Sequence, residues 1–131
     1  MAATISMKNT FHYEQASALL PAVRDRTCAV VKNVEPLYED LSRTPQGSPR
    51  WGQLKGRIDS AVQEWANEIL ALGALPKGIW NVDFDSGEGY FFCWSFDEDD
   101  LSHYHLYDDG FDGRKALTEV HRAGESPLLL N

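Results

Sequence analysis

The chain has 131 residues and a formal net charge of −8, and 43% of its residues are hydrophobic. This length is typical of one domain with one core, and the acidic balance argues against nucleic-acid binding, which needs a basic surface. No stretch approaches the ~20 apolar residues of a membrane span, the N-terminus lacks a signal-peptide pattern, and Cys28 and Cys93 fit no CxxC motif. We therefore expect a cytoplasmic protein with reduced thiols.

The first half of the chain has the periodicity of helices. From Leu20 an apolar stripe steps by three and four residues through Val23, Thr27, Val30, Val34, Leu37 and Leu41. Pro21 suits the first position of a helix, so residues 10–20 are expected to form a short helical turn or a separate short helix that leads into a longer one. Pro36 is expected to kink or locally break the longer helix, because proline lacks the amide proton that a helix needs.

A connector rich in turn residues spans 42–50. Within it, Ser48 and Pro49 are typical of a helix N-cap and first position. A second stripe follows through Trp51, Leu54, Ile58, Ala61, Trp65, Ile69 and Leu72. Gly73 stands where the glycine that ends a helix is expected. Two amphipathic helices with a short connector predict an antiparallel hairpin over about residues 11–73.

The period then changes from helical to alternating. Aromatic and β-branched runs at 79–85, 90–96 and 101–107 predict a three-stranded antiparallel meander. A glycine-bearing loop follows, and residues 115–124 are expected to form a short helix or an irregular tail. The predicted fold is a single α+β domain, with an N-terminal antiparallel helix hairpin packed on a three-stranded antiparallel β-meander (about 78–117) and a C-terminal tail (118–131).

Alternation along the strands predicts an aromatic face and a polar face. The aromatic face, packed on the helices, is expected to carry Trp80, Val82, Phe84, Tyr90, Phe92, Trp94 and Phe96, with Tyr104 and Leu106 from the third strand. The polar face then carries Asn81, Asp83, Asp85, Phe91, Cys93, Ser95, His103, His105 and Tyr107. The orientation of the third strand depends on a register that the turn lengths do not determine.

Acidic residues are concentrated in this second half. The segment 79–113 contains ten Asp and Glu residues and no Lys or Arg. The pattern has two interpretations. The acids can simply occupy turns, where Asp is favoured and charge improves solubility, or they can form a site for a cation or a basic partner.

Several short motifs in this region resemble one known family. They are VDF at 82–84, CW at 93–94, Glu98, YH at 104–105 and GFDGR at 110–114. In this order, after a helix start that ends at Pro21, they resemble the bacterial family called domain of unknown function 2203, over about residues 11–117. The chain departs from the family pattern at His12, Phe92, Asp97 and Tyr104. The resemblance implies no activity, so the function has to be argued from the residues.

The first candidate chemistry is metal binding. Two histidines separated by one residue point to the same face of a strand, and His103 and His105 could bind a divalent ion together with Asp83 or Glu98. The alternative is a pair of half-buried histidines bonded to carboxylates. A second candidate is a calcium loop at 108–119, which lacks an acidic residue at its third position.

The remaining candidate is acid–base catalysis. Asp83, Glu98, His105 and Arg114 could supply a carboxylate–histidine pair and an anion clamp. The alternative is a salt bridge by which Arg114 ties the 110–114 loop to the sheet. Cys93 is a weaker nucleophile candidate, since a cysteine among aromatic residues in a strand usually serves packing.

We expect a small binding or regulatory module, a homodimer, whose acidic sheet face contacts a ligand or a basic protein partner. The alternative is a metal-binding protein or metal-dependent enzyme that uses His103, His105, Asp83 and Glu98, with a divalent metal ion as cofactor. A purely structural assembly protein is a third interpretation. The sequence leaves open whether the chain is an enzyme.

Overall fold

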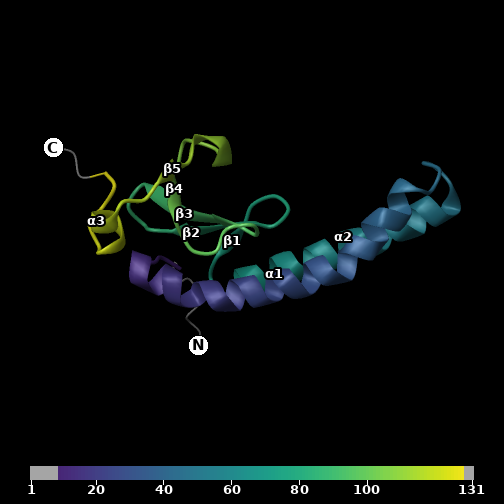
Figure 1. The fold of residues 1–131 in the computed structure, drawn as a ribbon, viewed down its shortest axis with the longest axis horizontal. Helices are drawn as coiled ribbons and strands as arrows, with labels where there is room; N and C mark the ends of the chain where they lie inside the picture. Colours follow the sequence, from purple (N-terminus) through teal and green to yellow (C-terminus); the bar gives the residue numbers. More distant parts are fainter. Residues whose placement is uncertain (1–8, 129–131) are drawn as a thin grey trace, which may run out of the picture.

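The computed structural model of the chain describes residues 9–128. Two helices, α1 (Tyr13–Ser42) and α2 (Pro49–Ala71), form the predicted hairpin, and a sheet packs against the half of the hairpin where the chain enters and leaves it (Figure 1). The other half extends as an arm beyond the sheet and holds a small core of Leu37, Leu54 and Ile58. No helix in residues 9–128 combines the length and the hydropathy needed to span a bilayer.

The first helix is longer than predicted. It starts at Tyr13 and runs without a break to Ser42, with both Pro21 and Pro36 inside it. The expected separate short helix and the break at Pro36 are therefore wrong. Both prolines lie at exposed positions, so water can bind the carbonyl groups that lose their helical partners, and the burial of one continuous apolar face outweighs a cost of ~3 kcal/mol for each proline.

The second helix begins and ends as the sequence predicts. Ser48 is the N-cap, and its hydroxyl accepts a hydrogen bond from the amide of Trp51 at 3.2 Å. Pro49 occupies the first helical position. After Ala71 the chain turns at Gly73, whose φ of +96° is a conformation that side chains with a Cβ rarely adopt.

The sheet has five strands instead of the predicted three. Its order is β1-β2-β3-β4-β5, and all neighbours are antiparallel. The three predicted strands correspond to β2 (Asn81–Asp85), β3 (Tyr90–Ser95) and β4 (His103–Leu106), flanked by the two-residue strands β1 (Leu75–Pro76) and β5 (Lys115–Ala116). The short strands have no alternating pattern of their own, because two residues are too few to show one. The 3₁₀ turn η1 (Phe111–Gly113) lies between β4 and β5. After β5 comes the short helix α3 (Glu119–Arg122), which confirms the predicted short helix in the tail.

The strand register confirms the two predicted faces. Asp83 pairs with Cys93, and Cys93 pairs with His103, so these three side chains lie in one row across the sheet. The inner face buries its aromatic and aliphatic side chains against the helices in one core, which includes Leu20, Val23, Trp65, Ile69, Val82, Phe84, Phe92 and Trp94. The polar side chains are thereby directed to the outer face, which lies away from α1 and α2 (Figure 1).

Candidate functional site

The centre of the outer sheet face is a buried carboxylate–imidazole pair. Asp83 on β2 and His105 on β4 have side chains only 2% and 6% exposed, and the His105 Nε2 and the Asp83 Oδ2 lie 3.0 Å apart. The imidazole reaches Asp83 across the intervening strand β3, where it also packs against the ring of Phe91 at 5.2 Å between centroids.

The hydrogen bonds of His105 determine how its ring is protonated. Its Nδ1 lies 3.0 Å from the carbonyl oxygen of Leu106 and 2.9 Å from that of Asp109. Because carbonyl oxygens only accept hydrogen bonds, Nδ1 carries a proton and donates it. The other ring nitrogen, Nε2, is the one that faces Asp83. The same bonds attach the residues after β4 to the sheet.

Asp83 is incompletely satisfied. Its Oδ1 is buried and has no hydrogen-bond partner. Burial raises the pKa of this carboxyl group, and the opposing effects of His105 and Lys77 are smaller. A buried carboxylate oxygen without a donor costs free energy that a proton or a cation would recover.

Cys93 completes a cluster that sequence reasoning did not assemble. Its Sγ, one carboxylate oxygen of Asp83 and one ring nitrogen of His105 all lie within 4.8 Å of one another. Burial, and then the neighbouring Asp83 charge, raises the pKa of the Cys93 thiol to about 12, although Arg114 acts in the opposite direction. The alternation in the sequence predicted that Cys93 lies on this face, but Cys93 was considered there only as a nucleophile or as a packing residue.

The other predicted residues form a second, adjacent group. Arg114 Nη1 lies 2.6 Å from Glu98 Oε2, which confirms the expected pairing of this arginine with a local carboxylate. The Glu98 Oε1 accepts the amide hydrogen of Ser95 at 3.0 Å. His103 Nδ1 is 3.5 Å from Glu98 Oε2 and 3.0 Å from the hydroxyl oxygen of Ser102. The four predicted metal ligands are thus divided into two pairs, Asp83 with His105 and Glu98 with His103.

The geometry limits the chemistry of the cluster. In a nucleophilic triad, the histidine would use one nitrogen for the thiol and the other for the carboxylate. Here His105 uses Nδ1 for backbone carbonyl groups, so it cannot connect Cys93 to Asp83 in that way. Within residues 9–128, the Asp83, Cys93 and His105 cluster is the only place where three His, Cys, Asp or Glu ligand atoms converge, and the 108–119 segment contains none.

A small cavity opens beside the cluster. It has a volume of about 160 Å³, and its walls include Lys77, Asp83, Phe91, His105 and Phe111. A water molecule or a small ligand could therefore approach Asp83 and His105 from the solvent side. Cys93 does not line this cavity and is fully buried.

Comparison with known proteins identifies a family for the chain. The family model described as Uncharacterized conserved protein (DUF2203) matches residues 9–117, so the chain belongs to this family. No curated protein and no solved structure matches the chain. The motifs that suggested the resemblance include Asp83, Cys93 and His105, which the fold brings together, and Glu98 and Arg114, which lie next to them.

Proposed function

We propose that this member of the DUF2203 family is a metal-binding protein that holds a divalent transition-metal ion among Asp83, Cys93 and His105. Zinc is the ion that we expect the site to prefer. The observation that carries the proposal is the convergence of three buried ligand atoms within 4.8 Å. One oxygen, one sulfur and one imidazole nitrogen form a mixed ligand set that suits zinc better than magnesium or calcium, which prefer oxygen ligands.

The distances and the hydrogen bonds support this assignment. Ligand atoms around a tetrahedral zinc ion lie about 3.3–3.7 Å apart, as follows from the usual metal–ligand bond lengths. Small side-chain rotations would bring the cluster into this range. The ring of His105 already donates its Nδ1 proton to carbonyl groups, which is the usual support for a histidine that binds metal through Nε2. A metal ion would also give the Asp83 carboxylate, whose Oδ1 has no partner, a counter-charge.

The other interpretation, a homodimeric binding or regulatory module with an acidic sheet face, stays a prediction. Two acids of that face, Asp83 and Glu98, are paired with His105 and Arg114. The face therefore offers less free negative charge to a basic protein than the sequence suggests, and this favours the metal-binding interpretation. Analytical ultracentrifugation of the purified chain would test the predicted dimer.

Zinc and cobalt titrations of untagged, chelator-treated protein test the proposal. We expect one ion per chain, and we expect Co²⁺ to produce the thiolate-to-metal charge-transfer band that requires Cys93. Cys93→Ser changes a single atom and should remove the band, whereas Cys28→Ser on α1 should keep it. His105→Gln should weaken binding at least 10-fold, and His103→Gln on the same strand and face should not.

Two results would overturn the proposal. The first is a protein that binds neither ion more tightly than about 10 µM, which is weaker than a three-ligand site should bind. The second is binding that both Cys93→Ser and His105→Gln leave unchanged, because the ion would then lie elsewhere. Circular dichroism of each variant shows whether a loss of binding reflects a loss of fold.

A further inference from the structure

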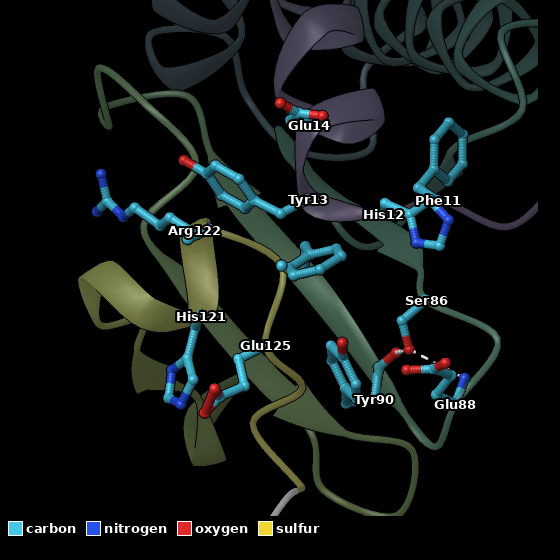
Figure 2. A pocket seen from close by; sticks show the side chains of 13 residues that line it. Phe11, His12, Tyr13, Glu14, Ser86, Glu88, Tyr90, His121, Arg122 and Glu125 are labelled. Atoms are coloured by element: carbon cyan, nitrogen blue, oxygen red, sulfur yellow. Dashed lines mark hydrogen bonds between the residues drawn. The ribbon is translucent and has the colours of Figure 1, made fainter.

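A second cavity lies on the inner side of the sheet, away from the Asp83, Cys93 and His105 cluster. It has a volume of about 290 Å³. Figure 2 shows that its walls come from three separate parts of the chain: residues 11–14 at the start of α1, residues 86–90 in the β2–β3 turn and the beginning of β3, and residues 121–125 in and after α3. This volume lies just below the range of about 300–1,000 Å³ that is typical of small-molecule sites.

Aromatic rings form the floor of this cavity. Phe92 and Tyr90 are 2% and 5% exposed, and their ring centroids lie 5.3 Å apart at an interplanar angle of 89°. Tyr13 packs edge-to-face on Phe92 at 5.8 Å, and its hydroxyl donates to the carbonyl oxygen of Leu101. These contacts hold the rings in fixed orientations. The face of an aromatic ring carries partial negative charge, which attracts cations.

The rim of the cavity carries negative charge that no neighbour neutralises. Glu14, Glu88 and Glu125 line it, all three are exposed, and none forms a salt bridge with another residue in the 9–128 range. The only Lys or Arg among the lining residues, Arg122, is instead bonded to Asp100 at 3.3 Å.

The histidine of the α3 wall is oriented by the backbone. The Nδ1 of His121 accepts a hydrogen bond from the amide of Thr118 at 3.1 Å. The ring of His121 packs edge-to-face on Tyr104 at 6.0 Å. The cavity therefore combines an aromatic floor with a rim of net negative charge.

Hydrogen bonds fix two of the three walls before any ligand enters. The amide of Phe11 donates to the carbonyl oxygen of Asp85 at 2.8 Å, which fixes the start of α1 on β2. In the β2–β3 turn, the amide of Glu88 donates to the Ser86 hydroxyl at 3.0 Å, and that hydroxyl donates to the carbonyl oxygen of Tyr90 at 2.7 Å. A site of fixed shape loses little entropy when it binds.

From this combination we infer that the inner cavity is a binding site for a small organic ammonium compound, whose apolar body lies on the rings of Tyr90 and Phe92 and whose cationic group faces Glu88 and Glu125. An anionic ligand would be repelled by the rim, and a neutral one would gain only the apolar contact. The inference does not rest on the metal site, which lies on the opposite face of the sheet.

Three probes of similar shape and different charge test the inference: phenethylammonium, 2-phenylethanol and 3-phenylpropionate, titrated into ¹⁵N-labelled protein at pH 7. Phenethylammonium should shift the amide signals of residues 86–90 and 119–125. It should bind about 10-fold more tightly than the alcohol, which is the size of effect expected from a cation on aromatic and carboxylate groups. The carboxylate probe should bind most weakly.

Variants and salt identify the source of the selectivity. The double variant Glu88→Gln/Glu125→Gln should bind phenethylammonium and 2-phenylethanol with similar affinity, whereas Glu64→Gln, an exposed glutamate of α2, should behave as the wild type. Raising the ionic strength should weaken the ammonium probe and leave the alcohol unaffected. Equal affinity for the three probes, signal shifts outside the cavity, or no shifts at 10 mM probe, on the order of the weakest useful affinity, would overturn the inference.

Discussion

The buried pair of Asp83 and His105 allows a quantitative test by removal of the imidazole. In His105→Ala the Asp83 carboxylate would have no partner on either oxygen, in a site where its side chain is 2% exposed. Removing one partner of a buried ion pair lowers the free energy of unfolding by ~3–5 kcal/mol. For a chain of this length such a loss lowers the midpoint of thermal unfolding by roughly 10–18 °C.

The matched control lies two residues earlier on the same strand and face. The side chain of His103 is 30% exposed, and its neighbour Glu98 keeps its ion pair with Arg114 and its hydrogen bond from the Ser95 amide when the imidazole is removed. His103→Ala should therefore cost less than ~1 kcal/mol. Urea unfolding followed by tryptophan fluorescence measures both variants under the same conditions.

A double-mutant cycle separates the pair from its surroundings. In Asp83→Ala/His105→Ala the lone buried carboxylate is gone, so the double variant should be more stable than the sum of the two single losses predicts, by ~1–3 kcal/mol. If His105→Ala costs as little as His103→Ala, or if the two single losses simply add, the description of Asp83 and His105 as a coupled buried pair is refuted.

Three further predictions concern single side chains. At pH 8 the Cys93 thiol, with its pKa of about 12, should react with iodoacetamide ~1,000-fold more slowly than in urea-unfolded protein. Equal rates would contradict the burial of Cys93, and the reaction rate of half-buried Cys28 in the same sample is the internal comparison. Burial raises the pKa of Asp83 above its ordinary 3.8, so the stability that this group contributes is present below pH 3.8 and is lost as the pH rises through its folded pKa. The unfolding free energy of the wild type, measured relative to that of Asp83→Asn, should therefore fall over that pH interval. A difference that does not change with pH would show that the pKa is not raised. Thr27→Val should cost ~1–3 kcal/mol, because it leaves the buried indole N–H of Trp65, now bonded to the Thr27 hydroxyl at 2.9 Å, without an acceptor; an unchanged midpoint in urea would mean that this N–H finds another partner.

The local patterns in the sequence predicted the helix hairpin, the three longer strands and the two faces of the sheet correctly. Alternation within a strand is a property of the backbone, so it separated aromatic from polar side chains within each strand. Which face the third strand, with His105, presents depended on a register that the sequence left open. Alternation does not indicate which of these side chains contact one another. His103 is directly opposite Cys93 in the register, yet His105 is the residue whose ring crosses β3 to reach Asp83, and side-chain direction across three strands is a tertiary property.

The errors in the fold have a common cause. Local rules for proline predicted a late start of α1 and a break at Pro36, but packing of the whole helix overrides them. The strands β1 and β5 form only because β2 and β4 offer free edges, so their own residues carry no signal. The inner cavity is built from residues 11–14 and 121–125, near the two ends of the described chain, and no local pattern indicates that these segments meet.

The two polar groups on the outer sheet face differ in a way that bears on function. Glu98 uses both carboxylate oxygens, one for the Ser95 amide and one for Arg114, as expected of a salt bridge that serves the fold. Asp83 is more deeply buried and has one oxygen without a partner. A buried ion pair is seldom more stabilising than apolar residues of the same volume. A pair with an unsatisfied oxygen stabilises the fold still less than a fully hydrogen-bonded pair. A purely structural role would therefore favour apolar residues at these positions, whereas a role in binding a cation accounts for the acid, the thiol and the imidazole together.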